Sequence, residues 1–166
     1  MVIIAGYSGV GKSALIEEMN HFEDVKGLHF LRGKFQQYKS NIPYFAFVEA
    51  LQIYFDKLLL SNNLELERFC SEFKKNIGDR GRVLTSLFPK LEFIVGKQAP
   101  ITQFIGVEAE NRLILTFLEF LKIIATKESP LVLFLDDLQW TDLVSLTILK
   151  SIIKEQIGYV FIGRIS

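Results

Sequence analysis

A glycine-rich loop near the start of the chain has the residue types that bind phosphate. Residues 6–13 read GYSGVGKS and match the pattern G-x-x-x-x-G-K-[ST]. Glycines let successive backbone N–H groups curl around an anion, Lys12 can reach the β- and γ-phosphates, and the Ser13 hydroxyl can ligate Mg²⁺. The residues predicted to bind nucleotide are therefore Gly6, Ser8, Gly9, Val10, Gly11, Lys12, Ser13 and Ala14.

Two adjacent acids follow an apolar run much later in the chain. Residues 131–135 read LVLFL, which predicts a buried strand, and Asp136 and Asp137 come next. In an open parallel sheet the C-terminal ends of the strands face the ligand crevice. We predict that Asp136 holds Mg²⁺ opposite Ser13 and that Asp137 orients or deprotonates the attacking water. The alternative is that the two acids only open a turn, where Asp is common.

The same stretch favours ATP over GTP. A GTPase would have D-x-x-G at this strand and N-K-x-D further on, whereas residues 136–139 read DDLQ and no N-K-x-D occurs. The second acid also favours an ATPase, whose nucleophile is water, over a small-molecule kinase, whose nucleophile is the substrate hydroxyl. The cofactor expected with ATP is Mg²⁺.

The elements that must position these residues follow from the apolar pattern. The loop lies between an apolar β-branched run and a helix-favouring segment, as the phosphate-loop motif requires. Short runs that are apolar on both faces and separated by helical patterns predict a parallel sheet covered by helices. The expected strands cover residues 2–5, 28–32, 131–135 and 159–162.

Between the second and third strands the pattern is helical. Apolar residues recur at helical spacing in four segments within about residues 40–128, and the third segment ends at Pro89. We predict one α/β domain over residues 1–166, a P-loop NTPase with a three-layer parallel sheet and a long helical insert. The predicted insert helices cover residues 47–58, 64–77, 82–88 and 107–127.

The composition argues against several classes of protein. The 19 Lys and Arg balance 19 Asp and Glu, so no overall positive charge favours nucleic acid. One cysteine, Cys70, cannot form an internal disulfide, and it lies in an apolar helical pattern that predicts a buried or half-buried position. No apolar run approaches the roughly 18 residues of a membrane span, and the first residues lack the basic segment followed by a hydrophobic stretch that is typical of a signal peptide. We expect a cytoplasmic domain that binds no nucleic acid.

The segment that starts at the two acids resembles a family signature. Residues 136–146 read DDLQWTDLVSL, which is similar to D-D-L-Q-W-A-D-x-x-S-L of the STAND signal-transduction ATPases, within the AAA-type group. Further similarities are GKF at 33–35, Pro43-Tyr44, and E-x-x-N-R at 108–112. The resemblance covers nearly the whole chain. It points to the ATPase domains of large bacterial and fungal proteins that also contain kinase-like, GAF and histidine kinase domains.

The resemblance implies a regulatory ATPase. In such proteins the nucleotide state switches a larger signalling protein between closed and open forms, slow hydrolysis resets it, and the neighbouring domains are the partners. Trp140 and Asp142 are signature positions of the family. Simpler roles are also open, namely Trp140 as a core anchor and Thr141 or Asp142 as the N-cap of a helix that runs to about Gln156.

The resemblance also implies an arginine that senses the γ-phosphate. The family's last strand ends in I-G-A-Y-R, and this chain has FIGR at 161–164, so Arg164 is the predicted sensor although it follows Gly163 directly. Two fewer residues change where an arginine leaves the strand. Arg80, Arg82 and Arg112 are further basic candidates, for which a solvated position is the simpler role.

Two other functions remain open from the sequence. One is a non-catalytic module, in which nucleotide only stabilises the fold and the helical insert binds neighbouring domains. The other is an AAA-type loader that acts on DNA, which the balanced charge disfavours. The family core has five strands in the order 5-1-4-3-2. We therefore expect a truncated domain whose fifth strand follows Ser166, and little turnover of ATP by residues 1–166 alone.

Overall fold

The computed structural model describes residues 2–5, 14, 18, 28–39, 42–100, 106–157 and 160–165. They divide into two compact units. One consists of residues 1–51 together with 124–166, and it contains the β-sheet. The other consists of residues 52–123 and is helical.

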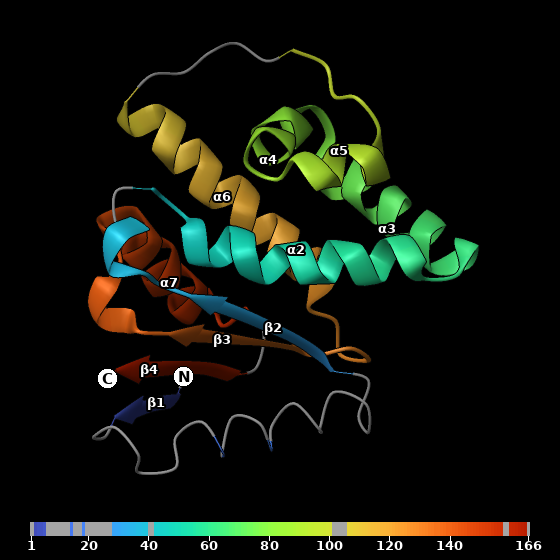
Figure 1. Cartoon of the computed structure of the whole chain (residues 1–166). Helices are drawn as coiled ribbons and strands as arrows, with labels where there is room; N and C mark the ends of the chain where they lie inside the picture. Colours follow the sequence, from blue (N-terminus) through green and yellow to red (C-terminus); the bar gives the residue numbers. More distant parts are fainter. Residues whose placement is uncertain are drawn as a thin grey trace. The chain divides into compact units, whose positions relative to one another are not determined.

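The first unit is built on a sheet of four parallel strands. Figure 1 shows all four arrows pointing the same way, and the strand order is β1-β4-β3-β2. The predicted parallel sheet is therefore confirmed, and among these strands the order agrees with that of the family core. Every C-terminal strand end lies at one edge of the sheet. The strands are β1 (Val2–Ala5), β2 (His29–Lys34), β3 (Leu131–Asp136) and β4 (Val160–Ile165).

Strand β3, one of the two inner strands of this sheet, is apolar at every position of the predicted run. All six of its residues are buried, as expected when both faces of a parallel strand are covered. Phe134 stacks on Phe30 of β2 with ring centroids 6.5 Å apart. The pairing of β2 with β3 continues to Lys34 opposite Asp136, so β2 ends two residues beyond the predicted Arg32. This extension brings Lys34 beside the predicted metal ligand.

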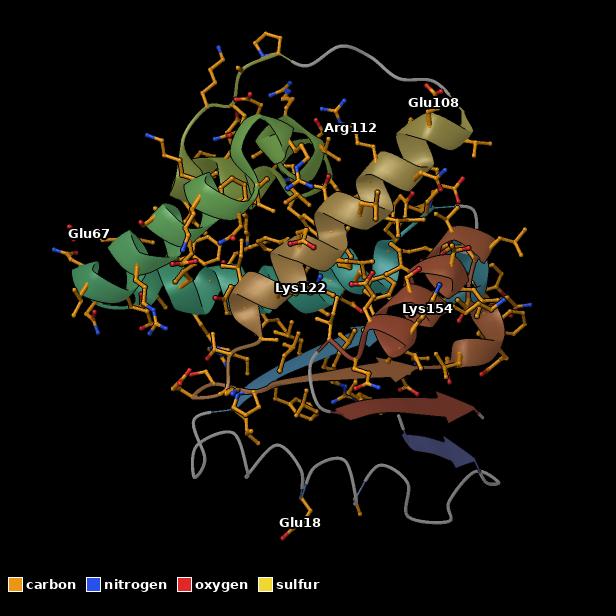
Figure 2. The ribbon with its side chains drawn as sticks, turned by 180° about the vertical axis from the view of Figure 1, so that it is seen from behind. Glu18, Glu67, Glu108, Arg112, Lys122 and Lys154 are labelled. Atoms are coloured by element: carbon orange, nitrogen blue, oxygen red, sulfur yellow. The ribbon has the colours of Figure 1, made fainter. Side chains whose placement is uncertain are left out.

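Helix α7 (Leu143–Glu155) lies along one face of the sheet in both Figure 1 and Figure 2. Its N-cap is Asp142, whose Oδ1 accepts from the Ser145 N–H at 2.8 Å and whose Oδ2 accepts from the Ser145 hydroxyl at 2.6 Å. Gln156 ends the helix with a left-handed φ of 53°. The N-cap interpretation of Asp142 is thus confirmed. Trp140 remains 36% exposed, so the core-anchor interpretation of that residue was wrong.

Replacing Asp142 with Ala should lower the free energy of unfolding by about 1 kcal/mol, the usual cost of removing an N-cap side chain. The reason is that the first turn of α7 loses the acceptor for the Ser145 N–H. Urea denaturation of the two proteins measures the difference. Thr147→Ala on the same helix is the control, because Thr147 is exposed and its hydroxyl donates to the Leu143 carbonyl within the helix, away from the N-cap. Equal losses in both variants would contradict the capping role.

The predicted helical insert is confirmed as a series of helices, with one addition. Pro89 was expected to stop a helix, but a further helix begins there, because proline suits the first helical position where its missing N–H costs nothing. Helix α2 begins in the first unit and ends in the second. The helices are α2 (Phe45–Leu60), α3 (Asn63–Asn76), α4 (Gly81–Leu87), α5 (Pro89–Val95) and α6 (Val107–Ile124).

A cluster of phenylalanines forms the core of the second unit. The ring of Phe120 on α6 has its centroid 6.0 Å from that of Phe55, 6.2 Å from that of Phe69, and 6.3 Å from those of Phe73 and Phe88. Such offset and edge-to-face pairs stabilise a fold by about 0.5–1.5 kcal/mol each beyond the burial of their area. The periodic apolar residues of the insert are therefore core residues, as predicted.

Cys70 on α3 is half-buried, as predicted. Its Sγ donates to the carbonyl of Ile94 at 3.3 Å, and burial raises the pKa of the thiol. Within the described part of the chain, no helix combines the length and apolar character needed to cross a bilayer.

Candidate functional site

The predicted site lies at the edge of the sheet where the parallel strands end. Strand β1 ends at Ala5, directly before the predicted phosphate loop, and β3 ends at Asp136. Only β4 separates these two strands, so they run about 10 Å apart, twice the spacing of neighbouring strands. The arrangement matches the edge at which open α/β sheets bind ligands.

The predicted loop residues themselves fall outside the described ranges. Gly6, Ser8, Gly9, Val10, Gly11, Lys12 and Ser13 therefore keep their predicted roles as predictions. Ala14 and Glu18, which are described, are helical and exposed. Glu18 is labelled in Figure 2.

Asp136 is the last residue of β3 and is 1% exposed. Its carboxylate Oδ1 accepts from the N–H of Asp137 at 2.9 Å, and its backbone carbonyl accepts from the N–H of Phe35 at 3.0 Å. A carboxylate buried this deeply requires hydrogen bonds or a cation, and carboxylate oxygens are ligands that Mg²⁺ prefers. Residue type, burial and position thus fit the predicted metal ligand.

No ready-made metal cluster occurs in the described ranges. Among those residues, no three His, Cys, Asp or Glu side chains lie close enough together to hold a metal ion. The predicted pair of protein ligands, Ser13 and Asp136, is compatible with this finding, because Mg²⁺ usually binds through few protein groups together with phosphates and water.

Asp137 leaves the strand at once. Its backbone has φ 54° and ψ 49°, in the left-handed region that Asp enters more readily than most residues other than glycine. A continued strand would place the Asp136 and Asp137 side chains on opposite faces. Because the backbone turns at Asp137, this alternation ends at Asp136. Both carboxylates can therefore lie at the same edge of the sheet.

Lys34 is the partner that the sequence did not assign. Its Nζ lies 3.2 Å from Oδ2 of Asp137, and the two side chains are 49% and 15% exposed. In the sequence Lys34 appeared only within the GKF similarity, without a role. A lysine shortly after one predicted strand and an acid just after another were the available signals. The family strand order makes these strands neighbours, but their register was needed to place Lys34 opposite Asp136.

Arg164 lies within β4 and not after it. The strand was expected to end at Ile162 but continues to Ile165, with Arg164 opposite Ile4 of β1 and Gly163 opposite Leu135 of β3. Partners on both sides hold Gly163 in extended form, so this glycine does not end the strand. Arg164 thus occupies a backbone position between the strand before the phosphate loop and the strand of Asp136. Its sensor role remains a prediction.

The other basic candidates, Arg80, Arg82 and Arg112, belong to the second unit. Arg80 donates from Nη2 to the Asn76 carbonyl at 2.6 Å, and Arg82 lies 3.5 Å from Glu92. Figure 2 places Arg112 one turn after Glu108 at the start of α6. The contacts of Arg80 and Arg82 suffice to explain these residues as parts of the helical fold.

Comparison with known proteins gives one family and one curated relative. The family described as AAA ATPase domain matches residues 1–162. The relative is Hybrid signal transduction histidine kinase G of Dictyostelium discoideum, which is 36% identical over 153 residues. The match covers 92% of this chain but 4% of that protein. No solved structure matches the chain significantly.

Proposed function

This chain belongs to the AAA ATPase domain family, and from this premise we propose that it binds Mg²⁺-ATP and hydrolyses it slowly as a regulatory switch. The observation that carries the proposal is the pair of acids at the end of the buried central strand. Asp136 is buried at the strand end, Asp137 follows in a tight turn, and the predicted phosphate loop begins two strands away.

The proposed roles divide between the two strand ends. The loop after β1 cradles the phosphates with its N–H groups and with Lys12. Ser13 and Asp136 hold Mg²⁺, which when bound neutralises charge on the phosphates. Asp137 orients the attacking water, and Arg164 senses the γ-phosphate.

The switch role rests on similarity to part of a signalling protein. The relative is named as a signal transduction histidine kinase, and this chain is similar to a small part of it. We infer that the partners of the domain are other domains of a multidomain signalling protein. Nucleotide can switch such a protein only if the γ-phosphate makes different contacts in the two states.

A second candidate is a nucleotide-stabilised interaction module without turnover. The observation in its favour is that Asp137 is paired with Lys34, so the acid expected to act on water is engaged elsewhere. Single-turnover hydrolysis separates the two functions. The assay uses radiolabelled ATP and an excess of the intact multidomain protein, not residues 1–166 alone. Release of phosphate supports the switch, and ATP that stays bound and intact supports the module.

The nucleotide preference gives a direct test of the proposal. ATP should displace a fluorescent ATP analogue from the protein at a several-fold lower concentration than GTP, because the chain has no N-K-x-D motif to bind guanine. Competition titrations with Mg²⁺ present measure both concentrations. Equal displacement by ATP and GTP would show that the base is not distinguished, and the assignment to ATP would fail.

A further inference from the structure

The N–H of Lys34 has an acceptor outside the sheet. In a parallel strand successive N–H groups point to opposite sides. The N–H groups of His29 and Phe35 donate toward β3, to the carbonyls of Pro130 and Asp136. That of Lys34 points away from β3 and donates to Oε2 of Glu49 on α2 at 2.8 Å. Glu49 thus adds a second restraint, beside the pairing with β3, to the backbone from which the Lys34 side chain extends.

The start of α2 is held tightly against this strand end. A Cβ on Gly33 would lie 2.0 Å from the carbonyl oxygen of Ala46, so only glycine permits the contact between the two backbones. Glu49 lies three residues after Ala46, on the same side of the helix. The close approach at Gly33 therefore brings the Glu49 carboxylate within reach of the next N–H along β2.

Lys34 joins two acids that belong to different elements. Its backbone N–H binds Glu49, and its Nζ binds Asp137 at 3.2 Å. A lysine side chain that is 49% exposed has many rotamers open to it, so a fixed backbone limits the positions its ammonium group can reach. Asp137 is thereby paired with a residue of β2, whereas β1, the strand that ends directly before the predicted phosphate loop, lies beyond β4 on the other side of β3.

We propose that Glu49 is a positioning residue for Asp137 and acts through Lys34. The link of Glu49, Lys34 and Asp137 restrains Asp137 on the β2 side of β3. This restraint lowers the rate at which Asp137 orients or deprotonates the attacking water. The inference rests on the proposed function for its catalytic consequence. The positioning itself depends only on contacts within the first unit.

The structural part of the inference is tested by NMR on the protein without nucleotide. Glu49→Ala and Lys34→Met should move the side-chain carboxyl ¹³C signal of Asp137 in the same direction, because both loosen the ion pair. Glu49→Gln keeps an oxygen acceptor for the Lys34 N–H and should restore the wild-type position. Asp56→Ala is the matched control, because Asp56 is an acid on the same helix that pairs with Lys90. An Asp137 signal that moves in Lys34→Met but not in Glu49→Ala would overturn the proposal.

The catalytic part is tested by single-turnover ATP hydrolysis with the intact protein. Glu49→Ala should raise the rate about twofold to fivefold, the range expected on releasing an ion pair with one half-exposed partner. ATP affinity should change by less than about twofold, because the residue does not belong to the phosphate site. In an Asp137→Asn background the same substitution should have no effect on the rate. An equal acceleration in that background would overturn the proposal.

These outcomes separate the inference from the proposed function. If the wild-type protein binds ATP without hydrolysing it, the proposed switch function is contradicted. The NMR comparison still decides whether Glu49 positions Asp137. If the wild-type protein hydrolyses ATP, and Glu49→Ala has the same rate and the same Asp137 signal, the switch function stands. The proposed role of Glu49 is then contradicted.

Discussion

Replacing Asp137 with Asn is expected to slow ATP hydrolysis by roughly 10²- to 10⁴-fold, the usual contribution of a positioned general base. Asparagine has nearly the same shape as aspartate and keeps an oxygen acceptor, but it cannot take a proton from water. ATP affinity should change little, because the proposed phosphate and metal ligands are unaltered. Single-turnover hydrolysis with the intact protein in excess measures the chemical step, and calorimetry measures binding.

Two further variants show whether the effect belongs to the acid itself. Lys34→Met removes the cation that pairs with Asp137 and should not slow hydrolysis, so a slow Asp137→Asn variant cannot be explained by the lost ion pair. Asp136→Asn should mainly weaken Mg²⁺-dependent binding, because it removes a metal-binding carboxylate. Normal hydrolysis in Asp137→Asn, together with normal Mg²⁺-ATP binding in Asp136→Asn, would mean that both acids only shape the turn.

Replacing Lys12 with Ala is expected to weaken ATP binding at least tenfold. The ammonium group is predicted to make charge-assisted contacts with the β- and γ-phosphates, and each such contact contributes about 1.5–3 kcal/mol. Loss of one contact of this size already corresponds to a tenfold or larger change in affinity. Isothermal titration calorimetry with Mg²⁺-ATP measures the dissociation constants of both proteins.

The control for this variant is Lys154→Ala. Lys154 is labelled in Figure 2 on the last turn of α7, and it is an exposed lysine of the same unit. Its removal changes the net charge by the same amount and should leave ATP affinity unchanged. Unaltered ATP affinity in Lys12→Ala would contradict the phosphate-loop assignment. Equal loss of ATP affinity in both variants would indicate a general effect of charge.

Several features of the first unit could be predicted from local sequence. The apolar β-branched residues of Val2–Ala5 predicted β1 with the observed bounds, and the run LVLFL predicted β3 to within one residue. Asp142, with Thr141 one of the two predicted N-cap residues, marked the start of α7. These predictions succeed because strand pattern and helix capping depend on residues that are neighbours in the chain.

The helical unit was predictable in pattern and less so in its breaks. Periodic apolar residues predicted four helices. Pro89 is compatible with the end of one helix and with the start of the next, and the structure has a helix beginning there. Trp140 shows the same limit, because an aromatic residue at a family signature position gives no measure of its exposure. Burial depends on what the rest of the chain covers.

The sequence by itself determined the chemistry that this chain can offer: a phosphate-binding loop pattern and two acids after a buried strand. Tertiary structure decided how the acids are held. The pairing of Lys34 with Asp137 and the place of Arg164 between β1 and β3 depend on strand register, and the N–H of Lys34 reaches Glu49 because α2 packs against the end of β2. The family resemblance gave the strand order, but the residue-by-residue register arises from pairing between segments far apart in the chain, and the short apolar runs did not specify it.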